Sequence, residues 1–411
     1  MTARLSRRAL LGSAAAGTAG VGVGAVSGWV ARDDEVPASL KPVRGWYGDT
    51  QPGISDRTRA NTMLASFTCV SSDRAGVAQM LKDLGAEAHR LCDGLSEGDP
   101  VPAAPPPTTG IMTGDTTKGT TVAVSVGASL FDHRFGLADR RPAELVTMPF
   151  LVNDRLEPGW SHGDVLVQVA ADRPDALAHA IRQLMRATRD SLVLHWVIDG
   201  FNHSDPGEQL GRTNNRNMLG FKDGTANLDM AGAEAKEFVW VDPDLNNGAE
   251  PAWTVNGTYQ VVRLIRTLVE QWDRAALIEQ EHIIGRDKAH GAPLGLGKEE
   301  DDPDYADDPD GARIPLTAHI RLARPRTAST EHQRMLRKGF NYSRGFDDAG
   351  LVDQGLAFIS YQKTLDAFLV IQERLKGEPL EEYTLPYGGG FFFTLPGVRD
   401  GDDWLGRSLF A

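Results

Sequence analysis

The stretch NTMLASFTCVSS, residues 61–72, is typical of a buried β-strand, because apolar, small and β-branched residues fill it. The stretch that follows, DRAGVAQMLKDLGAEAHRL (73–91), carries apolar residues at helical spacing from Val77 onward. Asp73 is placed to cap this helix. A strand that leads directly into an amphipathic helix is the opening of a β-α-β unit.

The rest of the first half continues the same pattern. Hydrophobic periodicity predicts a hairpin of two strands, then a helix with Asp172 as its cap, then a closing strand. The resulting order, β-α-β-β-α-β, is that of a ferredoxin-like unit, with a long insertion at about 130–160 in its hairpin. The predicted strands are 120–126, 164–171 and 192–197, and the predicted helix is 172–189.

The second half repeats this order less regularly, as β-α-β-β-β-α-β. The sequence therefore predicts an α+β protein of two ferredoxin-like domains, residues 45–205 and 206–411, with antiparallel sheets and helices packed around a pocket. The predicted strands are 258–265, 318–322, 334–342, 356–361 and 390–395, and the predicted helices are 267–280 and 364–376.

Composition narrows the function classes. The 411-residue chain has a formal net charge of −13, which argues against the clustered positive charge of a nucleic-acid-binding surface. The two cysteines, Cys69 and Cys92, cannot form a thiolate cluster; they are either one disulfide or, as we expect, two buried free thiols. A metal or cofactor would have to be held by His, Asp, Glu or Tyr.

Residues 1–30 differ from the rest of the chain. Ser6-Arg7-Arg8 precedes a weakly apolar run, rich in Ala and Gly, that extends from residue 12 to residue 26. This pattern is typical of a twin-arginine signal peptide. A transmembrane anchor is the alternative, but Gly and Ala dominate the run, so we expect none. The protein is then exported, to an extracellular, periplasmic or cell-surface location.

The stretch NMLGFKDGTANLDM (217–230) places Asp223 between an apolar run and Gly224. Asp-Gly is a common turn, and a turn is one interpretation. The other is a carboxylate for proton transfer, held in a closed pocket. The stretch lies between the two predicted domains, where pockets are common.

Three other features have two interpretations each. His319, in an apolar segment, is either a core residue or a metal ligand, and Arg337 is either a surface residue or part of a site. The acidic segment 298–311 is a solvated loop or lid in one interpretation and a cation site in the other. Its carboxylate spacing does not follow the Ca²⁺-loop pattern.

Several motifs, in their order along the chain, resemble the dye-decolourising (DyP-type) haem peroxidase family, from about residue 45 to the C-terminus. The signal segment points to the exported, iron-uptake-associated (EfeB-like) branch. The motifs are LFDHRFGLADRRP (130–142), SHGDVLVQVAAD (161–172), GFKDGT (220–225), AHIRLARPR (318–326), LRKGFNYSRG (336–345) and YGGGFFFTLPG (387–397).

The resemblance implies one haem b per chain. It makes His319 the proximal iron ligand, and Asp223 and Arg337 the catalytic pair on the distal side. Relatives often carry Asn at the position of Arg324, so Arg326 is the better partner for a haem propionate. The carboxylate expected to bind the proximal imidazole is not identifiable from the sequence. The other residues implied to line the haem are Gly224, Thr225, Ala226, Arg324 and Pro325.

The function implied is that of a secreted peroxidase that forms Compound I with hydrogen peroxide and then oxidises dye-like, phenolic or other bulky donors. The alternative is a haem- or iron-handling protein that releases iron from haem or binds haem for iron uptake, with a metal-handling protein as partner. A non-haem α+β binding module is a third interpretation. A homo-oligomer is compatible with all three.

Overall fold

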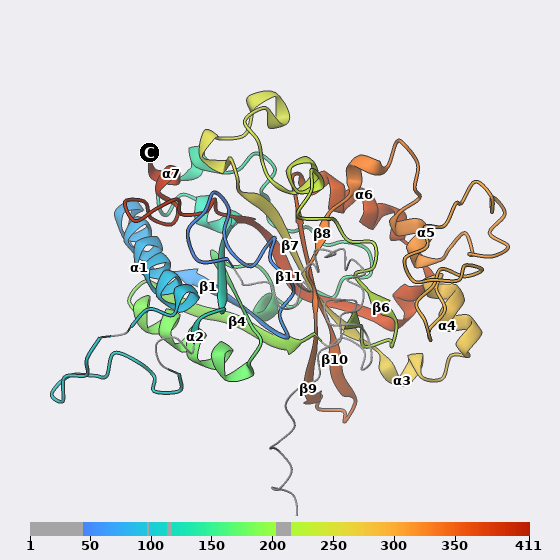
Figure 1. The fold of residues 1–411 in the computed structure, drawn as a ribbon, viewed down its shortest axis with the longest axis horizontal. Coiled ribbons are helices and arrows are strands. Elements are labelled where there is room, and N and C mark those ends of the chain that lie inside the picture. Colours follow the sequence, from blue (N-terminus) through green and yellow to red (C-terminus); the bar gives the residue numbers. More distant parts are fainter. Residues whose placement is uncertain (1–43, 97, 113–116, 203–214) are drawn as a thin grey trace, which may run out of the picture. The chain divides into compact units, whose positions relative to one another are not determined.

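The first half of the chain folds as its hydrophobic periodicity predicts. The structure is a computed structural model that describes residues 44–411 except 97, 113–116, 203–214 and the side chains of 215, 246 and 247, so the predicted signal segment lies outside the described residues. Four strands pair antiparallel in the ferredoxin-like order β2-β3-β1-β4, and α1 and α2 pack on one face (Figure 1). The elements are β1 (Asn61–Cys69), α1 (Arg74–Asp93), β2 (Thr121–Gly127), β3 (Val165–Ala171), α2 (Pro174–Ala187) and β4 (Leu192–Phe201).

The second half has the same order, β11-β7-β10-β9, again antiparallel throughout. The prediction of an α+β fold with two ferredoxin-like units is confirmed, whereas the predicted boundary near residue 205 stays a prediction. Two short strands, β5 (Asn215–Arg216) and β6 (Lys222–Asp223), form a separate hairpin between the halves. The other elements are β7 (Thr258–Thr267), α3 (Val269–Trp272), α4 (Leu277–Ile284), α5 (His319–Ala323), β8 (Leu336–Arg337), β9 (Phe340–Phe346), β10 (Val352–Gln362), α6 (Leu365–Leu375), β11 (Thr384–Thr394) and α7 (Arg407–Phe410).

The two four-stranded sheets join at both edges and close into a ring of eight strands. β11 pairs with β2 over three residue pairs, and β4 meets β9 at one pair, Phe201 with Asn341. Gly200 permits this second contact, because a Cβ there would lie 1.9 Å from the Asn341 carbonyl oxygen. One hydrophobic cluster contains residues from all eight strands and therefore fills the inside of the ring. A second cluster joins the outer face to α1, α2 and α6.

The N-termini of α1 and α2 show that local sequence determines one helix cap and that tertiary contacts determine the other. Asp73 caps α1 as predicted, accepting a hydrogen bond from the Gly76 amide at 2.8 Å. The prediction that Asp172 caps α2 is wrong. Arg173 is the N-cap residue and makes no side-chain cap bond, and the Asp172 carboxylate instead binds Arg57 and Arg59 at 2.5 and 2.6 Å. Two guanidinium groups bind a carboxylate more strongly than a helix terminus does.

Three predicted elements differ from the structure. The segment 318–322 was expected as a strand but forms helix α5, because five residues are too few to separate a period of 2 from one of 3.6. The helix expected at 267–280 is interrupted between α3 and α4. The strand expected at 334–342 is divided into β8 and β9, which both pair with β10 on either side of a break at residues 338–339.

Both cysteines are free and buried, as expected. Burial raises the pKa of the Cys92 thiol to about 12, so almost no nucleophilic thiolate exists at pH 8. We expect iodoacetamide at pH 8 to leave Cys92 of the folded protein unmodified for hours and to alkylate it within minutes in guanidinium chloride. Peptide mass spectrometry measures both. Complete modification of folded protein would contradict the burial.

Candidate active site

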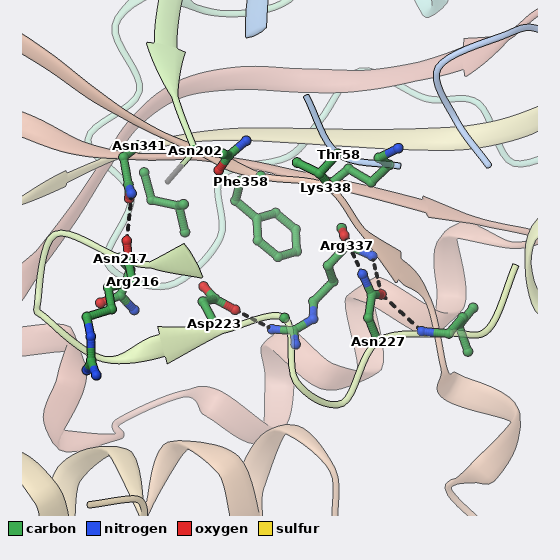
Figure 2. A pocket seen from close by; sticks show the side chains of 14 residues that line it. Thr58, Asn202, Arg216, Asn217, Asp223, Asn227, Arg337, Lys338, Asn341 and Phe358 are labelled. Atoms are coloured by element: carbon green, nitrogen blue, oxygen red, sulfur yellow. Dashed lines mark hydrogen bonds and ion pairs between the residues drawn. The ribbon is translucent and has the colours of Figure 1, made fainter. Parts of the chain in front are cut away.

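Asp223 and Arg337 come together from distant parts of the sequence. Arg337 Nη1 lies 3.1 Å from Asp223 Oδ1, joining β6 to β8 (Figure 2). Asn227 holds the Arg337 backbone from both sides: its Nδ2 donates to the Arg337 carbonyl at 2.6 Å, and its Oδ1 accepts from the Arg337 amide at 2.9 Å. The guanidinium therefore projects from a fixed backbone position.

The Asp223-Gly224 step is both a turn and part of a cavity wall, whereas proton transfer by Asp223 stays a prediction. Gly224 has φ of 98°, which a residue with a side chain rarely adopts, and its carbonyl accepts from the Asn227 amide at 3.1 Å. Thr225 turns away and donates its hydroxyl to Glu299 at 2.7 Å. Ala226 is exposed.

A cavity of about 220 Å³ lies against the Asp223–Arg337 pair. A cavity of this size can hold several small molecules. Its wall is mostly polar, with an apolar part formed by two leucines and a phenylalanine (Figure 2). The lining residues are Thr58, Asn202, Arg216, Asn217, Asp223, Gly224, Asn227, Leu228, Arg337, Lys338, Gly339, Asn341, Leu356 and Phe358.

His319 begins helix α5 and is held by a carboxylate that the sequence did not reveal. Its Nδ1 lies 2.8 and 3.1 Å from the two oxygens of Glu378, whose side chain is buried. Burial lowers the pKa of His319 but Glu378 raises it more, so the net pKa is raised. The charges of Arg337 and Asp223 also act on this pKa, Arg337 lowering it and Asp223 raising it.

A hydrogen bond from Nδ1–H to a carboxylate fixes the ring and leaves Nε2 as the atom that can bind a metal. Glu378 lies among three glutamates, at 378, 381 and 382, after a helix. Nothing in their local sequence separates the buried one from its neighbours, and only the fold places Glu378 against His319.

Two arginines, Arg324 and Arg326, follow helix α5 closely in the sequence. Burial, together with the nearby Arg286, lowers the pKa of Arg326 to about 10. Arg326 binds Asp302 of the acidic segment, and Arg324 binds Glu331 at 3.3 Å. The Nε atoms of Arg324 and Arg326 are buried and have no hydrogen-bond partner among the described residues. Pro325 lies between them, half-buried.

The acidic segment 298–311 contains buried carboxylates and contacts residues next to Asp223, unlike a fully solvated loop. Glu299 is buried and binds Lys222 at 2.8 Å as well as Thr225. Asp308 is buried and accepts from the backbone amides of residues 313 and 314. In the part of the chain that the structure describes, no three His, Cys, Asp or Glu residues are arranged to hold a metal ion.

Comparison with known proteins shows the family to which the chain belongs. Models of the N-terminal and C-terminal domains of Dyp-type peroxidases match residues 51–202 and 214–399. The chain belongs to the Dyp-type peroxidase family. Members of this family bind haem, so the protein is a haem-dependent peroxidase. The predictions of family, enzyme class and cofactor are confirmed.

Relatives of this Dyp-type peroxidase cover nearly its whole length. It is 43% identical over 402 residues to a deferrochelatase of Shigella flexneri serotype 5b (strain 8401), covering 94% of this chain and 95% of that one. It is 44% identical over 387 residues to a deferrochelatase of Escherichia coli O157:H7, covering 92% and 91%.

Solved structures of Dyp-type peroxidases share its fold. The DyP-type peroxidase from Cellulomonas bogoriensis matches with a TM-score of 0.77 and 33% identity over 89% of this chain and 98% of that one. Ferric DtpA from Streptomyces lividans matches with a TM-score of 0.79 and 31% identity over 91% and 99%.

The residues of this Dyp-type peroxidase fit a haem. His319 presents a metal-binding nitrogen whose orientation Glu378 fixes. Arg324 and Arg326 present buried N–H groups without partners among the described residues, which suits carboxylates such as propionates. Asp223, Gly224 and Arg337 line one cavity. The individual roles of these residues stay predictions.

Replacing Glu378 with glutamine tests the support of His319. The variant should bind haem about 10- to 100-fold more weakly, because the imidazole loses the charged acceptor that orients it. The apparent Kd comes from titrating haem-free protein with haemin and following the Soret band. Glu382→Gln, an exposed neighbour, is the matched control and should keep the parent affinity. Equal affinity in the two variants would contradict the role of Glu378.

Proposed function

We propose that this protein is an exported haem b peroxidase that uses hydrogen peroxide to oxidise dye-like, phenolic or other bulky donors. The observation that carries the proposal is the Asp223–Arg337 pair, 3.1 Å apart, at the wall of a cavity in a haem-binding fold. The pair offers a proton acceptor and a permanent positive charge at one place.

Peroxide cleavage requires one oxygen to lose a proton and the other to gain one. Asp223, when ionised, accepts the proton from the first oxygen and returns it to the second, directly or through a water. Such general acid–base transfer contributes about 10²- to 10⁴-fold to a rate. Arg337 keeps its proton and stabilises the negative charge that develops on the departing oxygen.

Haem, when bound, supplies the electrons that the O–O bond takes up as it breaks. His319 would hold the iron through Nε2, and Glu378 would keep the imidazole oriented. Arg326 would hold a propionate. His319 and Glu378 would then position the iron, and Asp223 and Arg337 would move the proton and stabilise the developing charge.

Export is supported by the sequence. The paired arginines at 7 and 8 precede a mild apolar run, as in twin-arginine signals. Within the described residues, no helix is long and apolar enough to cross a membrane. A homo-oligomer and a metal-handling protein partner stay predictions.

A second function has its own support. The relatives at 43% and 44% identity are named deferrochelatases, and they match over more than nine-tenths of this chain. The same pocket would then bind haem as a substrate from which iron is released. The chemistry differs in its products: a peroxidase keeps its iron, whereas a deferrochelatase leaves porphyrin without iron.

One experiment separates the two functions. Haem-loaded protein receives one equivalent of hydrogen peroxide and then a reducing dye, with an iron chelator present. A Soret band that shifts within seconds, returns with the dye and survives many cycles supports the peroxidase. Porphyrin fluorescence together with chelated iron supports iron release. A Soret band that does not respond to peroxide would overturn the proposed catalytic role of Asp223 and Arg337.

A further inference from the structure

Two asparagine side chains in the cavity wall are buried and incompletely bonded. Asn202 is 8% exposed and Asn341 is 5% exposed. The Nδ2 atom of Asn202 and the Oδ1 atom of Asn341 are buried, and neither has a hydrogen-bond partner among the described residues. Both residues line the cavity that contains Asp223 and Arg337. Buried polar atoms are almost always paired, so two unpaired ones in one wall require an explanation.

The fold fixes the position of both amides. Asn341 lies on β9 and Asn202 directly follows β4, at the seam where the pair Phe201–Asn341 closes the ring. Asn341 Nδ2 donates to the Arg216 carbonyl at 2.7 Å, which orients the amide and leaves its oxygen unpaired. The backbone amide of Asn202 donates to the Ala60 carbonyl at 2.8 Å. One wall therefore presents an oriented acceptor, Asn341 Oδ1, and an unpaired donor, Asn202 Nδ2, on a backbone that is held in place.

Figure 2 shows the two amides on one side of the cavity and Asp223 on the side facing them. β5 and β6 connect these walls: Arg216, which Asn341 holds, pairs with Lys222, the residue before Asp223. A molecule that binds between the amides therefore lies in the same cavity as the proton-transfer pair.

We propose that Asn202 and Asn341 form a docking site for hydrogen peroxide, from which it moves to the Asp223–Arg337 pair. Peroxide is small and uncharged, and each of its oxygens both donates and accepts a hydrogen bond. Peroxide can therefore bond to an unpaired donor such as Asn202 Nδ2 and to an unpaired acceptor such as Asn341 Oδ1. An anion could satisfy only the donor. This inference rests on the proposed function, because it assumes that peroxide is cleaved beside Asp223.

Asn202→Leu is the decisive variant, since leucine keeps the branching of the side chain at Cγ and has no polar atom. The haem-loaded variant should react with hydrogen peroxide with a second-order rate constant about 5- to 10-fold lower, the equivalent of one lost hydrogen bond. Its thermal midpoint should equal or exceed that of the parent, because an unpaired buried donor is removed. Stopped-flow absorbance measures the rate constant, and calorimetry measures the midpoint.

Thr58→Val is the matched control. Thr58 lines the same cavity but has no buried, unpaired side-chain atom, so this variant should keep the parent rate constant. A crystal structure of the parent should contain an ordered water joining Asn202 Nδ2 to Asn341 Oδ1, and the Asn202→Leu crystal should lack it. This readout does not depend on turnover.

The inference is overturned if Asn202→Leu reacts at the parent rate, or if Thr58→Val slows the reaction equally. Failure of the proposed function has a different signature. In that case Asp223→Asn would react with peroxide as fast as the parent, whatever the effect at Asn202. If both predictions hold, the Asn202→Leu rate recovers when the peroxide concentration is raised, whereas the Asp223→Asn rate stays far below the parent rate at every concentration tested.

Discussion

Asp223→Asn is expected to slow the reaction of the haem-loaded protein with hydrogen peroxide by about 10²- to 10⁴-fold. Asparagine keeps the shape of the side chain and its contact with Arg337 but cannot accept the proton. Stopped-flow absorbance at the Soret band gives the rate constant. The ferric spectrum before mixing should match that of the parent, which shows that the haem is bound normally.

Arg337→Leu should show a loss of about 10²- to 10³-fold, because it removes a fixed charge at the developing anion. Since Asp223 and Arg337 touch, the double variant should lose much less than the product of the two single losses. Both side chains are about one-third exposed, so breaking the pair should change folding stability by less than about 1 kcal/mol. Parent-like rates in both single variants would remove this pair from the mechanism.

His319→Ala should abolish stable haem binding. The loss should exceed the roughly 10- to 100-fold expected for changes around a ligand, because the ligand itself is gone. The haem content after gel filtration, measured as the pyridine haemochrome, should fall far below one per chain. Added free imidazole should restore part of the Soret band, because it can occupy the space that the ring leaves.

His290→Ala is the control for this variant. The His290 side chain is 83% exposed and, among the residues that the structure describes, binds only the nearby Asp287, so its removal should leave the haem content unchanged. A parent-like Soret spectrum and full haem content in His319→Ala would show that another residue holds the iron. Loss of haem with intact secondary structure, checked by circular dichroism, would support the assignment.

Local pattern predicted the elements better than it predicted their assembly. The strands around 61–69 and 258–267 follow from long apolar and β-branched runs, and Asp73 caps its helix as a local rule requires. The prediction of a strand at 318–322 was wrong because five residues fit both the two-residue period of a strand and the 3.6-residue period of a helix. The pairing of β2 with β11 and of β4 with β9 joins residues far apart in sequence, and no local signal encodes it.

The site residues likewise divide into those that local sequence indicates and those that only the fold reveals. The sequence placed Asp223 beside a turn glycine and drew attention to Arg337, and the fold brought the two side chains to 3.1 Å. Glu378 was missed because a carboxylate at the end of a helix resembles any solvated one, and its importance arises only from contact with His319. Roles that depend on a contact between distant residues require the fold to be known.

The closed ring also dictates when the protein can finish folding. β11, which ends at Thr394, seals the ring against β2, which begins at Thr121, and Gln51 bonds both the Val124 and Leu395 carbonyls across the same seam. Until the ribosome has delivered nearly the last residue, β2 remains an unpaired edge of the kind that recruits other chains. A nascent or truncated chain thus has a site for aggregation that the finished molecule covers with β11.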